Sequence, residues 1–221
     1  MIGATGNSLK ARNLKWLVLL AFLDAVLITG IALPQVQDVG FTNTIIGRAL
    51  APGLLPLIVL ILINLFPTSF KFRLLYWKGP DGLPGASAFS RLGPADPRVD
   101  MSVIERHLKE LPVTPSEQNK KWYRLFRQVR TAPAVEQAHQ VSLMFRDMVA
   151  MSAVLAVVVP LIVWWITGDL HLAGVVFAVL IVQYLTLVAN GRAAGERFVS
   201  NVLAEHSVLP DSPASKLRSE N

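Results

Sequence analysis

Long apolar stretches constrain this chain more than any other feature. A helix rises about 1.5 Å per residue, so about 20 mostly apolar residues cross the roughly 30 Å hydrocarbon core of a bilayer. Four stretches meet this requirement and are predicted membrane spans: residues 14–33, 45–66, 148–167 and 171–190. The sequence therefore predicts an all-α integral membrane protein with four transmembrane helices. A helical, Gly/Pro-rich cytoplasmic segment is expected between spans two and three.

The basic residues are distributed unevenly about these spans. Lys10, Arg12 and Lys15 lie at the start of the first span, and residues 67–147 hold thirteen of the 21 lysines and arginines. The two short connections on the opposite side contain none. Because basic loops stay in the cytoplasm, both termini and the central segment are predicted to be cytoplasmic. The net charge of +6 is then typical of loops beside anionic lipids, and no nucleic acid is expected as a partner.

This topology divides the chain into four parts. Residues 1–66 form the cytoplasmic N-terminal tail and the first two spans, and residues 67–147 form the cytoplasmic segment. Residues 148–190 form spans three and four. Residues 191–221 are predicted to be a cytoplasmic helical extension followed by a tail.

Within the cytoplasmic segment, proline and glycine predict a turn-rich linker over residues 67–98. Apolar residues at helical spacing predict a helix from Met101 to Leu111, and a capping box at Thr114 predicts another over residues 115–130. A third helix is expected from about Pro133, running unbroken into the third span.

The helix over residues 115–130 has an apolar stripe and an opposite basic side that contains Lys120, Arg124 and Arg127. The basic side is either a solvated face or a surface that binds anionic lipid or a phosphate-bearing ligand.

Polar residues inside the predicted spans are the other candidates for function. Asp24 lies near the middle of the first span and is either a pore-lining or proton-titrating group or a structural carboxyl between helices. Gln183 in the fourth span is either an interhelical hydrogen-bonding group or part of a conduction path. Arg48, near the outer end of the second span, extends to the interface or pairs with Asp24.

The residue types needed for most enzyme chemistry are missing or scattered. The chain has no cysteine, its four histidines lack metal-ligand spacing, and its carboxylates do not cluster as an acid–base pair. No metalloprotease, nucleotide-binding or serine-hydrolase motif occurs. We therefore expect no catalytic residue, no metal and no cofactor, and the chain is not predicted to be an enzyme. An activity on lipid headgroups is a third alternative for which the sequence names no residue.

Two strings in the cytoplasmic segment, LLYWKGPDGLPGASAFSRLGPADPRVD at 74–100 and PSEQNKKWYRLFRQV at 115–129, support a resemblance. They resemble small bacterial four-span membrane proteins, some of which act as effectors in anti-phage defence after a nucleotide signal. The resemblance implies a multi-pass protein of the bacterial inner membrane, and it identifies no functional residue.

The leading hypothesis is an oligomeric, channel-like membrane effector whose cytoplasmic segment senses a signal and whose spans perturb membrane integrity. Its expected partners are the lipid bilayer, further copies of the chain or a larger membrane complex, and an anionic lipid or nucleotide ligand. The alternative is a non-conducting accessory or assembly subunit of a larger membrane complex.

Overall fold

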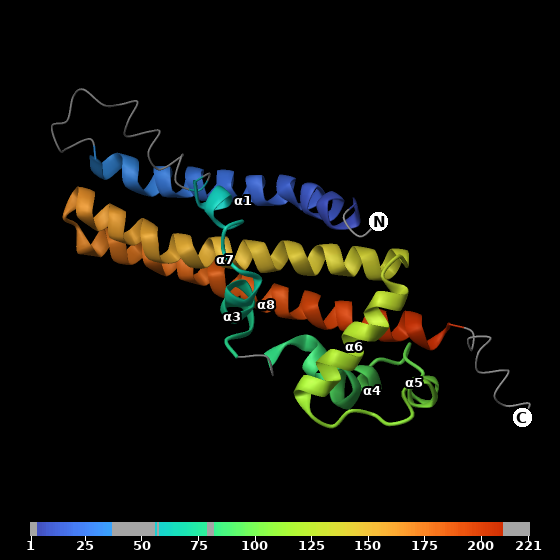
Figure 1. The fold of residues 1–221 in the computed structure, drawn as a ribbon. Helices are drawn as coiled ribbons and strands as arrows, with labels where there is room; N and C mark the ends of the chain where they lie inside the picture. The colour runs from blue at the N-terminus through green and yellow to red at the C-terminus, as the bar shows by residue number, and fades with distance from the viewer. Residues whose placement is uncertain (1–3, 37–55, 57, 79–81, 210–221) are drawn as a thin grey trace, which may run out of the picture. The chain divides into compact units, whose positions relative to one another are not determined.

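The computed structural model describes residues 4–36, 56, 58–78 and 82–209, and every regular element within them is helical (Figure 1). The predicted all-α class is therefore confirmed for this part of the chain. The longer helices are α1 (Ala4–Val36), α6 (Pro115–Val129), α7 (Pro133–Thr167) and α8 (Leu170–Ser207). The shorter elements are α3 (Thr68–Tyr76), the 3₁₀ helix η2 (Pro84–Ser87), the π-helix η3 (Ala88–Leu92), α4 (Gly93–Ala95) and α5 (Met101–Leu108).

The chain divides into two compact units. Unit 1 comprises residues 1–77 and 143–191, and unit 2 comprises residues 78–142 and 192–221. Both α7 and α8 contribute to both units, and neither helix is interrupted where the chain passes from one unit to the other. This continuity confirms the prediction that a helix beginning near Pro133 runs unbroken into the third apolar stretch.

Three helices are long and apolar enough to cross a membrane, namely α1, α7 and α8. They contain the first, third and fourth predicted spans. The second predicted span, residues 45–66, lies largely outside the described residues, as does Arg48. Its described end is helical over residues 58–62 and then turns, so this helix ends before Phe66. The part of the chain that the structure describes thus contains three candidate spans, where the sequence predicted four for the whole.

The buried side of α1 shows how unit 1 is packed. Asn13, Leu17, Ala21, Asp24 and Ile28 recur every three or four residues and form its buried stripe. The three apolar members pack into one hydrophobic core with residues of α7 and α8, including Met151, Leu155, Val159, Val176 and Leu180. The two buried polar side chains described in this helix, Asn13 and Asp24, therefore lie on the side that faces other helices.

The exposed sides of the same helices are apolar. Phe22 of α1, Leu161 of α7 and Val182 of α8 have 62%, 57% and 62% of their surface exposed. The exposed side of a helix in a water-soluble protein is normally polar, and a helix that is apolar all round is typical of a protein core or a membrane span. None of the described residues covers these faces, and their apolar character is compatible with a lipid surrounding.

A two-residue connection joins α7 to α8. Gly168 has a φ of +67°, the left-handed conformation that glycine adopts without a steric cost. Asp169 then caps α8, because its Oδ1 accepts a hydrogen bond from the backbone N–H of Leu172 at 3.0 Å. The hydroxyl of Thr167 donates to the carbonyl of Val163 at 2.8 Å and accepts from the backbone N–H of Asp169 at 3.1 Å. The two long helices are therefore tightly coupled at this end.

In unit 2, the two predicted helices are present and their caps explain where they begin. The Thr114 hydroxyl caps α6 by accepting from the backbone N–H of Glu117 at 3.4 Å. Asp100 caps α5 by accepting from the backbone N–H groups of Ser102 and Val103. The predicted apolar stripe of α6 is buried in a core with α8, and it consists of Trp122, Leu125, Phe126 and Val129.

The prediction of a turn-rich linker over residues 67–98 is wrong in part, because α3, η2, η3 and α4 lie within it. The physical reason is the position of the prolines. Pro67 is the N-cap of α3, and Pro84 begins η2. Proline is well tolerated in the first turn of a helix, where its missing N–H has no helical partner to lose. These prolines therefore start short helices here instead of preventing them.

The buried side chain of Gln118 holds η3 against α6. Its Oε1 accepts hydrogen bonds from the backbone N–H of Phe89 at 3.1 Å, the backbone N–H of Ser90 at 3.2 Å and the Ser90 hydroxyl at 3.1 Å. Its Nε2 donates to the carbonyl of Val113 at 3.2 Å. One amide thus satisfies backbone donors of a π-helix that have no helical partner.

Candidate functional site

Three polar side chains meet inside the apolar core of unit 1, one from each candidate span. The Gln183 amide of α8 donates from Nε2 to Oδ1 of Asp24 on α1 at 2.8 Å. The same nitrogen lies 3.4 Å from Oγ of Ser152 on α7. Asp24 is 1% exposed and Ser152 is 0% exposed. We call Asp24, Ser152 and Gln183 the polar trio.

The trio is an interhelical contact within a single chain. Its hydrogen bonds link α1, α7 and α8. Oδ2 of Asp24 is buried and has no hydrogen-bond partner among the described residues. Burying a polar group without a hydrogen-bond partner is costly, so this contact holds the three helices together at a cost to stability.

Sequence reasoning singled out two members of the trio and missed the third. Asp24 and Gln183 are conspicuous because they lie inside apolar stretches. Ser152 also lies in such a stretch, but serine is common in membrane helices and commonly bonds to its own helix. Ser152 is only the fifth residue of the predicted span 148–167, so its position gave no signal that it meets two residues near the middle of their spans.

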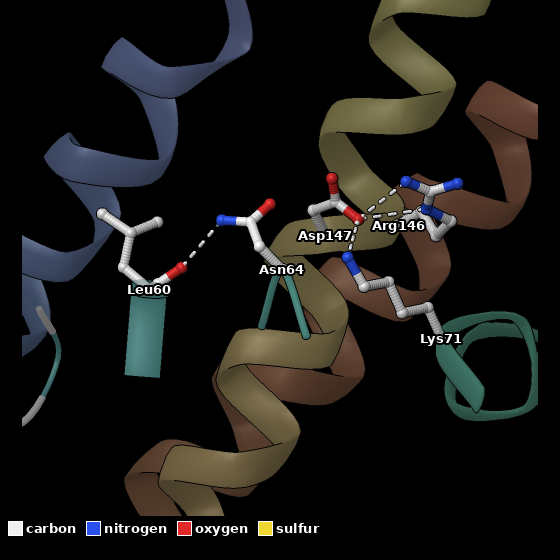
Figure 2. A network of polar contacts seen from close by, with 5 residues as sticks. All are labelled: Leu60, Asn64, Lys71, Arg146 and Asp147. Atoms are coloured by element: carbon white, nitrogen blue, oxygen red, sulfur yellow. Dashed lines mark hydrogen bonds and ion pairs between the residues drawn. The ribbon is translucent and has the colours of Figure 1, made fainter. Parts of the chain in front are cut away.

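A second polar cluster in unit 1 lies where α3 meets α7 (Figure 2). Lys71 Nζ donates to Oδ1 of Asp147 at 3.0 Å. Arg146 donates to the same oxygen from Nε at 3.0 Å and from Nη2 at 2.9 Å. The Arg146 guanidinium carbon also lies 5.6 Å from the centre of the Phe72 ring. We call Lys71, Arg146 and Asp147 the charged cluster.

The charged cluster is almost completely covered by protein. Only 6% of the Lys71 side chain, 8% of Arg146 and 13% of Asp147 is exposed. Both cations belong to the basic residues that predict the cytoplasmic side, but their position in the sequence does not indicate that they share a carboxylate. The pairing joins positions 76 residues apart, which spacing along the chain does not reveal.

The end of α3 also contacts α8, through hydrogen bonds of the Tyr184 hydroxyl. The Trp77 indole donates from Nε1 to the Tyr184 hydroxyl at 2.8 Å, and that hydroxyl donates to the carbonyl of Leu74 at 2.7 Å. The Trp77 ring is 56% exposed. An exposed tryptophan whose polar atom is tied back to the protein is typical of the boundary between lipid and water.

The predicted basic side of α6 is present in unit 2. Lys120, Arg124 and Arg127 are all exposed, while the apolar stripe on the other side of the helix is buried. Their spacing of four and three residues places them on one face. This face is open to a ligand or a surface, and nothing in its geometry selects one.

A histidine pair lies at the end of α8. His206 follows Arg192, the first charged residue after the uncharged part of α8, so it lies outside the segment that fits in a bilayer. Its Nε2 is 3.0 Å from Oε1 of Gln128, and its ring packs edge-on against His107 at 5.2 Å. Burial, and then the nearby His107, lower the pKa of His206 below its ordinary value of 6.5.

Among the described residues, no group of three or more His, Asp or Glu side chains is arranged to hold a metal ion. No family model, curated protein or solved structure matches the chain. A functional proposal therefore rests on the geometry of the chain itself.

Proposed function

We propose that this chain is an integral protein of the bacterial inner membrane that acts as an oligomeric, channel-like effector. Three helices with apolar exposed faces support insertion into a bilayer. The distribution of lysine and arginine supports an orientation with both termini and the part of unit 2 formed by residues 78–142 in the cytoplasm.

The observation that carries the proposal is the polar trio. A buried polar contact is seldom needed for stability, since an apolar core of the same volume is often as stable or more so. We propose that the trio acts as a switch between two states of the helices, one with its hydrogen bonds made and one with them broken. While Gln183 is bonded to Asp24, the carboxyl is buried between helices. When α1, α7 and α8 move apart, the side chains of the trio become exposed on the helix surfaces. In an oligomer, these surfaces face adjacent copies of the chain.

The continuity of α7 and α8 supplies the route by which a signal reaches the trio. Ser152 lies on α7 and Gln183 lies on α8, and both helices begin or end in unit 2. A ligand that prefers one arrangement of unit 2 shifts the population of these helices by its difference in affinity for the two states. Few polar groups line the described helices, so a conducting path requires several copies.

The test is a comparison of membrane potential and dye entry in bacteria that express the full chain at matched membrane levels. Gln183→Leu frees the Asp24 carboxyl from its partner and should increase the leak. Adding Asp24→Leu to that variant removes the carboxyl and should abolish the increase. Thr186→Val is the matched control, because Thr186 lies about one turn away and its hydroxyl donates to the carbonyl of Val182 on its own helix, at 2.9 Å.

The two outcomes are distinct. A leak that rises in Gln183→Leu, stays at the wild-type level in Thr186→Val and disappears in the double variant supports a conducting effector. Equal behaviour of Gln183→Leu and Thr186→Val, in protein that reaches the membrane folded, refutes it.

The second candidate function is a non-conducting subunit of a larger membrane complex. The observation that favours it is the nearly complete burial of Asp24, which suits a fixed interhelical fastening. This alternative predicts copurification with another membrane protein at a constant ratio and no leak from any trio variant.

A further inference from the structure

The charged cluster has an unbalanced charge. Lys71 and Arg146 each carry a positive charge, and among the described ion pairs both reach the same single carboxylate, Asp147. Both cations are more than nine-tenths covered. Removing charges from water is costly unless they are paired, so a covered cluster with one excess positive charge favours a further anion beside it.

The hydrogen-bonding capacity of the cluster is also only partly used. A guanidinium has five N–H donors and an ammonium has three. The described bonds of Arg146 and Lys71 converge on Oδ1 of Asp147, and Figure 2 shows the second amino group of Arg146 pointing away from that carboxylate. The guanidinium is held in this orientation by the Asp147 bonds and by the Phe72 ring. Donors therefore remain for an anion with several oxygens.

The position of the cluster along α7 identifies the type of anion. Asp147 is the last charged residue before the uncharged stretch 148–167, which is about long enough to cross the hydrocarbon core. The cluster thus lies at the boundary of the proposed span, the depth at which lipid phosphates occur. The neighbouring α3, which supplies Lys71, has no acidic residue, and the exposed Trp77 follows directly after it.

We propose that Lys71 and Arg146, oriented by Asp147, form a binding site for the phosphate group of an anionic membrane lipid. Arginine binds phosphate through paired N–H donors and lysine binds it as a point charge. Asp147 accepts from both cations and sets their separation, so it is a positioning residue. The inference rests on the proposed membrane insertion and is independent of whether the protein conducts.

The test uses the full chain in nanodiscs made of phosphatidylcholine alone or of phosphatidylcholine mixed with phosphatidylglycerol. Native mass spectrometry measures which lipid stays bound after release from the disc, and tryptophan fluorescence measures the melting temperature. Lys71→Gln and Arg146→Gln remove one positive charge each and keep a donor for Asp147. Arg73→Gln is the matched control, because Arg73 is an exposed basic residue of the same helix.

Wild-type protein and Arg73→Gln should retain phosphatidylglycerol in preference to phosphatidylcholine and melt at a higher temperature when it is present. Lys71→Gln and Arg146→Gln should each lose about tenfold or more of that preference, the change expected for a hydrogen bond to a charged group. Asp147→Asn should keep the preference, because it raises the positive charge of the site, and phosphatidylglycerol should restore part of any stability that it loses.

Other results overturn the inference. If the charged cluster only fastens α3 to α7, all three cluster variants melt lower by equal amounts in both lipids and the lipid preference does not change. If inorganic phosphate added to phosphatidylcholine discs reproduces the stabilisation, the ligand is a soluble phosphate compound and not a lipid. Extraction of cell membranes with carbonate tests insertion separately, so a failure of that premise is distinguishable from a failure of the site.

Discussion

Replacing Gln118 with methionine should loosen the contact between η3 and α6 without changing the shape of the core. The Gln118 side chain is 3% exposed, and its Oε1 accepts the backbone N–H groups of Phe89 and Ser90 together with the Ser90 hydroxyl. Methionine has a similar length and volume and accepts none of these bonds. The substitution therefore isolates the hydrogen bonds from the packing.

The magnitude follows from which donors lose access to a partner. The backbone N–H of Phe89 is buried, and leaving a buried donor unsatisfied costs about 1–3 kcal/mol. Ser90 is exposed, so water replaces its two bonds at a further cost of under about 1 kcal/mol. We expect local opening to become easier by about 2–3 kcal/mol, which is roughly a 30- to 150-fold larger open fraction.

Amide hydrogen exchange measured by mass spectrometry on the full chain reports this opening directly, in a peptide that contains Phe89 and Ser90. Ser90→Ala is the control, since it removes only the solvent-accessible hydroxyl and should change exchange by less than about threefold. An exchange rate in Gln118→Met within a factor of about three of wild type would show that these bonds do not hold η3 in place.

Two further predictions concern stability. Burial lowers the pKa of His206 below 6.5, so the unfolded chain binds a proton more readily than the folded chain. The stability of the protein should therefore fall as the pH drops through 6.5. His206→Gln should remove this dependence in melting curves recorded at pH values on both sides of 6.5. A Cβ on Gly191 would lie 2.8 Å from Cδ1 of Leu75 and 3.3 Å from Cβ of Phe145. Gly191→Ala should therefore lower the stability of the protein in nanodiscs by about 1 kcal/mol. Gly174→Ala is the control and should not lower it, because a Cβ there has no described atom within 4 Å.

Local features of the sequence predicted the helices well. The capping box at Thr114 predicted the start of α6, because it acts within one turn of the chain. The predicted end of the preceding helix at Leu111 is wrong, since α5 ends at Leu108. The apolar stripe of α6 was predicted for the same reason, since its period of three and four residues is visible without any knowledge of its neighbours.

The contacts between distant positions were beyond such reasoning. Gln183 and Asp24 are 159 residues apart, and Lys71 and Asp147 are 76 apart. Their meeting depends on how α1, α3, α7 and α8 are rotated about their own axes within unit 1, which hydrophobic periodicity does not specify for helices that are apolar all round. The composition indicated that Asp24 needs a partner in an apolar environment, but it did not identify Gln183 as that partner.

For the proposed membrane-inserted protein, the short connection at Gly168 and Asp169 also constrains how the chain would enter a bilayer during its synthesis. α7 and α8 share a buried core, and only two residues separate them. This connection is too short for the two helices to be inserted independently, one after the other. In the proposed orientation they pass through the insertion machinery as a single hairpin, and Asp169 is the one carboxylate in the connection that is translocated. Once across, this end offers a protease no extended backbone to cleave, so limited digestion of intact spheroplasts should leave the hairpin whole.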